Sequence, residues 1–85
     1  MTHLATPAFW FHYRLLPEDA RAVADKNFGL LRADPRHPSL RLKKVGAFWP
    51  VRIGLRYRAL ARDRPEGLAW FWIGPHDRYD EVLRA

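Results

Sequence analysis

The sequence predicts an α+β fold, in which a curled antiparallel sheet of about four strands, plus a short N-terminal strand, carries a helical hairpin on one face. Residues 45–62 alternate apolar and polar side chains on both sides of Gly54, which is typical of two strands joined by a turn. Residues 68–73, LAWFWI, are nearly all apolar and indicate a strand buried on both faces. Apolar residues also recur at helical spacing before these strands, at Ala20, Val23, Ala24, Phe28 and Leu31.

Composition limits the class of protein. The 85 residues are 48% hydrophobic, which indicates one folded domain spanning residues 1–85 and argues against disorder. The absence of cysteine excludes disulfides and thiolate metal sites and fits a cytoplasmic location. No apolar run is long enough to span a bilayer, so we expect no membrane contact. The net charge of +6 indicates nucleic acid or another polyanion as a partner.

The first half of the chain predicts one short strand and two helices. Residues 2–6 can form the strand, and Thr6 followed by Pro7 is a typical helix start. We expect a short helix at residues 8–15, although the alternation of its aromatic side chains leaves a strand open. Pro17 then opens a longer helix over residues 17–33, and Asp34-Pro35 ends it.

The second half predicts the sheet. Residues 34–39, DPRHPS, form a loop, and residues 40–45 are a candidate basic strand. The strand pair at residues 45–62 follows, then a turn at residues 63–67, the buried strand and a terminal helix at residues 76–83. If the turn after Gly54 centres on Leu55, Arg52 and Arg58 lie opposite each other with Cβ atoms ~5 Å apart. Two like charges so placed destabilise the sheet unless an anion lies between them, which predicts an anion site.

Several motifs in this order resemble the RelE/ParE superfamily of bacterial toxins. The segment VRIGLRYRAL, residues 51–60, contains the basic strand, glycine turn and Tyr-Arg pair that recur in that family. Residues 16–45 resemble the family's long helix, Asp-Pro loop and basic second strand, and residues 70–83, WFWIGPHDRYDEVL, resemble its last strand and functional C-terminal segment.

The resemblance implies a toxin that a cognate antitoxin neutralises, and it leaves two activities open. RelE-like members cut messenger RNA on the ribosome without a metal or cofactor, by attack of a 2′-hydroxyl on the adjacent phosphate. ParE-like members bind and poison DNA gyrase. We favour the ribonuclease, because inhibition by binding does not need a proton donor. A non-catalytic, basic RNA-binding domain is the third alternative.

The candidate catalytic residues follow from this comparison. Arg58 matches the family's Tyr-Arg position and Arg52 is a second phosphate clamp, although both could be solvated surface residues. His76 stands where the family often has arginine, so it could transfer a proton or bind phosphate. Tyr79 could stack on a base, donate a proton or only pack the terminal helix. We expect RNA-phosphate contacts from a further basic set: Arg41, Lys43, Lys44 and Arg56.

Lys43 and Lys44 are adjacent in the sequence. In a strand, adjacent side chains lie on opposite faces of the sheet, so we expect only one of the two to belong to the site. The other three histidines, His3, His12 and His37, lack metal-ligand spacing, so we expect no metal site.

Overall fold

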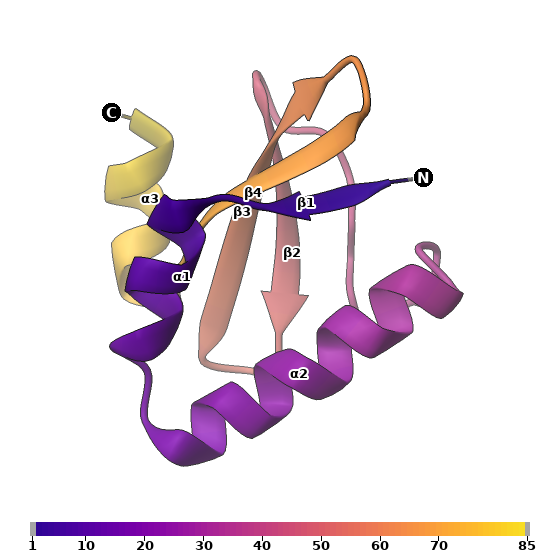
Figure 1. The fold of residues 1–85 in the computed structure, drawn as a ribbon. Coiled ribbons are helices and arrows are strands. Elements are labelled where there is room, and N and C mark those ends of the chain that lie inside the picture. Colours follow the sequence, from indigo (N-terminus) through magenta and orange to yellow (C-terminus); the bar gives the residue numbers. More distant parts are fainter. Residues whose placement is uncertain (1, 85) are drawn as a thin grey trace.

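The computed structural model describes residues 2–84, which form three helices and a four-stranded sheet in the order β1-β4-β3-β2 (Figure 1). Along the chain the elements are β1 (His3–Ala5), α1 (Pro7–Arg14), α2 (Glu18–Ala33), β2 (Phe48–Ile53), β3 (Tyr57–Arg64), β4 (Gly67–Pro75) and α3 (His76–Arg84). The α+β prediction is confirmed. No helix within residues 2–84 is long and apolar enough to cross a membrane.

The helices begin where the sequence predicts. Thr6 caps α1, because its side-chain oxygen accepts a hydrogen bond from the Phe9 N–H at 3.3 Å and Pro7 takes the first helical position. α2 begins directly after Pro17 and carries two acidic residues in its first turn, where they complement the helix dipole. Its predicted apolar stripe is buried at Ala20, Ala24 and Leu31.

The central hairpin also has the predicted register. Ile53 pairs with Tyr57 across a turn in which Gly54 has a φ of 61°, a conformation that glycine adopts without strain. Arg52 consequently lies directly opposite Arg58. Between Leu60 and Ala61 the pairing of β3 with β4 shifts by one residue, because Phe71 of β4 forms a bulge.

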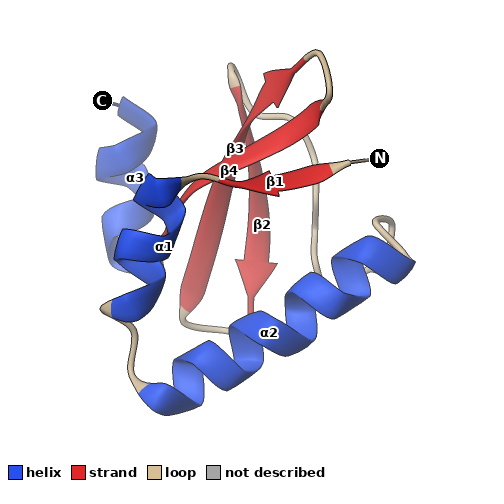
Figure 2. Cartoon of the chain, in the orientation of Figure 1, coloured by secondary structure: helices blue, strands red, loops and turns tan. Residues whose placement is uncertain are grey.

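The predicted strand at residues 40–45 is wrong. Residues 41–44 have no regular structure, and Val45 makes only an isolated bridge with Phe48 (Figure 2). Arg41 has a φ of 50°, which breaks an extended path, and the Leu40 carbonyl accepts a hydrogen bond from the Arg52 N–H at 2.7 Å. The sheet therefore has four strands with β1 included. It is mixed, because β1 runs parallel to β4.

The two sheet faces have different roles. One face packs against α1 and α2, and its core includes Phe9, Leu31, Ala59 and Trp70. Arg58 and Leu60 alternate with the core alanines of β3 and so point to the opposite face. α3 packs against β3 and β4. The loop between α2 and β2 also returns to this opposite side, where the polar side chains discussed next gather.

Candidate functional site

A basic pocket of about 160 Å³ lies on the sheet face that carries Arg58. We call it the basic pocket and define it by its lining residues: Arg41, Lys43, Val45, Pro50, Val51, Arg52, Arg58 and Tyr79. Four of these side chains are cationic and none is acidic. Such an arrangement attracts an anion, because each added positive charge raises the local potential.

Three separate parts of the chain build this pocket. The hairpin supplies Arg52 and Arg58 from paired positions on β2 and β3. The irregular loop before β2 supplies Arg41 and Lys43, and its hydrogen bond from the Arg52 N–H to the Leu40 carbonyl holds it against β2. α3 supplies Tyr79.

The electrostatics of the two arginines favour an added anion. Burial, followed by the neighbouring charge of Arg52, lowers the pKa of Arg58 from its usual value. The Arg58 Nη1 donates to the Tyr57 carbonyl at 2.7 Å, which fixes one side of the guanidinium. The Arg52 Nε is buried and has no hydrogen-bond partner among the described residues. A buried donor without an acceptor is costly, and an anion between the two guanidinium groups would offset their mutual repulsion.

Tyr79 places a phenol in the basic pocket. Its side chain is half-buried, and burial raises the pKa of Tyr79 despite the opposing effect of the Arg58 charge. The phenol therefore stays protonated at neutral pH and can donate a hydrogen bond or a proton. It cannot serve as a base under these conditions.

Two solved structures share this arrangement of elements. The RelB-RelE antitoxin-toxin complex from Methanococcus jannaschii matches with a TM-score of 0.69 at 12% identity, over 94% of this chain and 98% of that one. The isolated E. coli RelE toxin matches with a TM-score of 0.62 at 15% identity, over 96% of this chain and 94% of that one. The chain has the RelE fold. No family model matches the sequence, and no curated protein matches it.

Three predicted site residues of this RelE-like chain do not line the basic pocket. His76 is exposed at the first position of α3, and its backbone N–H donates to the Arg56 carbonyl at 2.8 Å. Arg56 is exposed in the hairpin turn. Lys44 makes a 2.9 Å salt bridge with Asp63, whereas Lys43 lines the basic pocket. Because residues 41–44 form no strand, the predicted alternation does not apply to this difference. Their roles remain predictions.

Asn27 is a supporting residue that sequence reasoning missed. It is the buried polar residue of α2, and its Nδ2 donates to the Arg52 carbonyl at 3.0 Å. This bond ties the core-facing helix to the strand that carries Arg52. The available signal was a polar side chain on the stripe of Ala20, Ala24 and Leu31, since such a group needs a partner when it is buried.

Among residues 2–84, no three histidine or carboxylate side chains lie close enough to form a metal cluster.

Proposed function

We propose that this chain is the toxin of a type II toxin–antitoxin system and that it cleaves messenger RNA on the ribosome. The observation that carries the proposal is the meeting of four cations and a protonated phenol in one pocket of a RelE fold. Cleavage of RNA by its own 2′-hydroxyl needs both kinds of group. Charge on the phosphorane must be stabilised, and the leaving oxygen must be protonated.

The proposed reaction assigns one task to each side chain. The 2′-oxygen attacks the adjacent phosphorus, and Arg58 and Arg52 stabilise the negative charge that develops on the phosphoryl oxygens. Tyr79 gives its proton to the departing 5′-oxygen as the P–O bond breaks. His76 takes the 2′-hydroxyl proton, or it holds a flanking phosphate while solvent water takes that proton, and histidine suits either task near neutral pH. His76 lies two residues beyond Gly74, and Gly74 pairs with Arg58 across β4 and β3.

The remaining basic residues extend the contact with RNA. Arg41 and Lys43 line the pocket and are exposed, so they can hold phosphates next to the one being cleaved. Arg56 and Lys44 lie outside it and would act through the potential of the surface. The Asp63 salt bridge reduces the contribution of Lys44.

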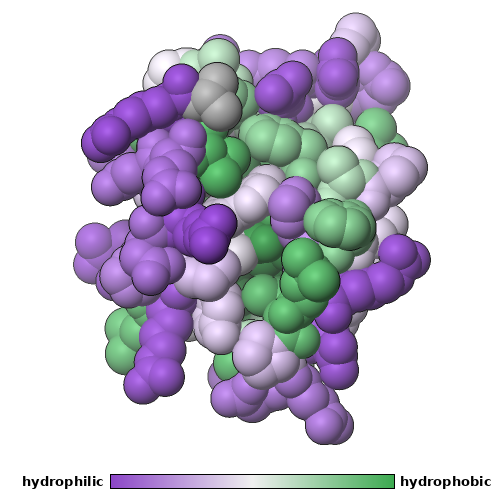
Figure 3. All heavy atoms as spheres, turned by 90° about the vertical axis from the view of Figure 1, so that its left-hand side faces the viewer, coloured by the Kyte–Doolittle hydropathy of each residue, from purple (hydrophilic) through white to green (hydrophobic). Residues whose placement is uncertain are grey.

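We propose a cognate antitoxin as the protein partner. One structural neighbour is an antitoxin-toxin complex, and this chain leaves large apolar side chains exposed on α1 and at the residue directly after it. Phe11 is 59% exposed and Leu15 is 69% exposed. Leu15 also lines a hollow with Trp72 and Pro75, and the face that carries α1 and α3 shows apolar groups surrounded by polar ones (Figure 3). An apolar surface of this kind is typical of a site that another protein covers.

The test is to induce the chain alone in bacterial cells and map the 5′ ends of translated messages. We expect growth arrest, with new ends inside the codons of translated regions, and relief when the antitoxin is co-expressed. Arg58→Ala combined with His76→Ala should abolish both effects, and the matched control Arg14→Ala, on the exposed side of α1, should not.

Other outcomes would contradict the proposal. Arrest without new RNA ends would favour a binding toxin such as one directed at gyrase. Normal growth with folded protein in the cell would contradict a toxin altogether. A folded double variant that arrests growth like the parent would place the toxic activity on another surface.

A further inference from the structure

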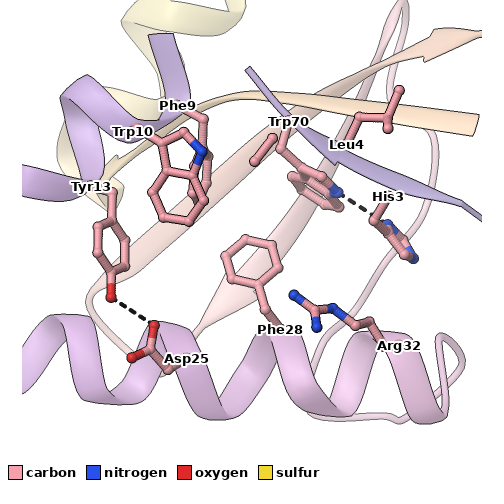
Figure 4. Close-up of a pocket in the computed structure, with 10 residues that line it drawn as sticks. His3, Leu4, Phe9, Trp10, Tyr13, Asp25, Phe28, Arg32 and Trp70 are labelled. Atoms are coloured by element: carbon pink, nitrogen blue, oxygen red, sulfur yellow. Dashed lines mark hydrogen bonds between the residues drawn. The ribbon is translucent and has the colours of Figure 1, made fainter. Parts of the chain in front are cut away.

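A second pocket, of about 90 Å³, lies on the helical side of the sheet between β1, α1 and α2 (Figure 4). We call it the aromatic pocket and define it by its lining residues: His3, Leu4, Ala5, Phe9, Trp10, Tyr13, Asp25, Phe28, Arg32 and Trp70. It shares no residue with the basic pocket, and nothing in the proposed ribonuclease reaction uses it.

The walls of the aromatic pocket are a connected set of rings. The Phe28 ring stands nearly perpendicular to those of Phe9 and Trp70, with both centroid distances 5.4 Å. Trp10 packs edge-on against Phe9 and remains 43% exposed. A planar aromatic ligand gains offset-stacked and edge-to-face contacts from such walls.

One end of the pocket presents hydrogen-bond donors without acceptors. The Trp70 indole N–H donates to His3 Nδ1 at 3.1 Å, so the proton of a neutral His3 is on Nε2. Burial and neighbouring positive charge lower the pKa of His3, which favours the neutral ring. Its Nε2 is buried and has no partner among the described residues. Arg32 lines the same pocket and makes no salt bridge within residues 2–84.

The other end is already satisfied. The Tyr13 hydroxyl donates to the Asp25 carboxylate at 2.7 Å, and Figure 4 shows this pair on the far side of Phe28 from His3. The Asp25 charge repels a second anion at that end. The pocket is therefore polarised, with positive charge and a free N–H at one end, aromatic rings in the middle and a carboxylate at the other end.

We propose that the aromatic pocket binds a single-ring aromatic carboxylate. The ring packs against Phe28 and Trp70, and the carboxylate accepts hydrogen bonds from the Arg32 guanidinium, beside the His3 ring that lines the same end. At about 90 Å³ the aromatic pocket is smaller than the cavity of about 150 Å³ that encloses benzene, so a single ring would enter it only in part, with one edge in the open mouth, and two fused rings would not fit. This site is separate from the proposed toxin activity and does not depend on it.

The test is an NMR titration of the intact, ¹⁵N-labelled chain with benzoate, with benzyl alcohol as the uncharged analogue and 2-naphthoate as the larger one. Benzoate should shift the His3 ring nitrogen and the Trp70 indole signals in a saturable manner. It should bind at least ~10-fold more tightly than benzyl alcohol, because hydrogen bonds to charged groups are stronger than neutral ones. 2-Naphthoate should bind more weakly than benzoate.

Matched variants identify the site. Arg32→Gln should weaken the binding of benzoate by ~10-fold or more and leave the affinity for benzyl alcohol unchanged. Arg36→Gln, at an exposed arginine in the following loop that does not line the pocket, should leave both affinities unchanged. The inference is overturned if benzoate does not saturate, if benzoate and benzyl alcohol bind equally, or if Arg32→Gln binds benzoate as tightly as the parent does. Backbone spectra of each variant show whether it is folded.

Discussion

Replacing Arg58 by glutamine should make the protein more stable and less active. Arg58 lies opposite Arg52 in the hairpin, and burial together with the Arg52 charge lowers the pKa of its guanidinium. Its charge is thus disfavoured in the folded state when no anion is bound. Glutamine removes the charge and keeps an amide donor, although it gives up the 2.7 Å hydrogen bond from Arg58 Nη1 to the Tyr57 carbonyl.

The size of the effect follows from the sheet geometry. Relief of a like-charge pair at opposed positions is worth about 0.2–1 kcal/mol. For a domain of this size each kcal/mol shifts the melting temperature by ~4–8 °C, so the expected rise is about 1–8 °C. Cleavage should fall by ~10²–10³-fold, as when an electrostatic stabiliser of the transition state is lost.

The same substitution four residues along β3 provides the control. The Arg62 guanidinium lies 4.6 Å from the centre of the Phe71 ring and 5.5 Å from that of Phe48. Arg62→Gln should therefore lower the melting temperature by removing cation–π attraction, and should leave cleavage unchanged. Calorimetry and 5′-end mapping measure both effects. A lower melting temperature for Arg58→Gln, with cleavage like the parent's, would refute the anion-site reasoning.

Three further predictions concern the acid, the RNA contact and the core. Tyr79→Phe should slow cleavage by ~10²–10⁴-fold, whereas the control Tyr13→Phe should have no effect. Burial raises the pKa of Tyr79, so the fall in cleavage rate caused by deprotonation of Tyr79 should lie above pH ~10. Lys43→Ala should reduce the slope of log affinity for RNA against log salt by ~0.7–0.9, whereas Lys44→Ala should change it less in filter-binding assays. Leu31→Ala should lower the free energy of unfolding by ~2–5 kcal/mol in urea titrations, since Leu31 is 1% exposed; an unchanged midpoint would contradict its place in the core.

Local patterns predicted the elements that are stabilised locally. The cap at Thr6, the stripe of α2 and the turn at Gly54 each depend on a few neighbouring residues, and the Arg52–Arg58 pairing follows from that turn. The assembly of Arg58 with Tyr79 was expected only from the family resemblance, since no local pattern brings β3 and α3 together.

The features that the sequence did not predict depend on distant contacts. Residues 40–45 have the composition of a strand. Their backbone, however, makes a single hydrogen bond with Arg52, through the Leu40 carbonyl, and Arg41 adopts a left-handed conformation. The parallel pairing of β1 with β4 and the bulge at Phe71 are set by how the sheet packs. The aromatic pocket forms where β1, α1, α2 and β4 meet, so no spacing in the sequence indicates it.

The central place of β4 determines when the protein can assemble. β4 lies between β1 and β3, and it bonds residues near the start of the chain: Thr6 Oγ1 to the Trp70 carbonyl across 64 positions, and the Trp70 indole to His3 across 67. A chain made from its N-terminus has no partner for β1 until residues 67–75 follow, and such distant pairs form slowly. The four cations of the basic pocket are synthesised before β4, whereas Tyr79 comes after it. Synthesis therefore separates the four cations from Tyr79 in time, and the basic pocket can be complete only after residue 79 has been added.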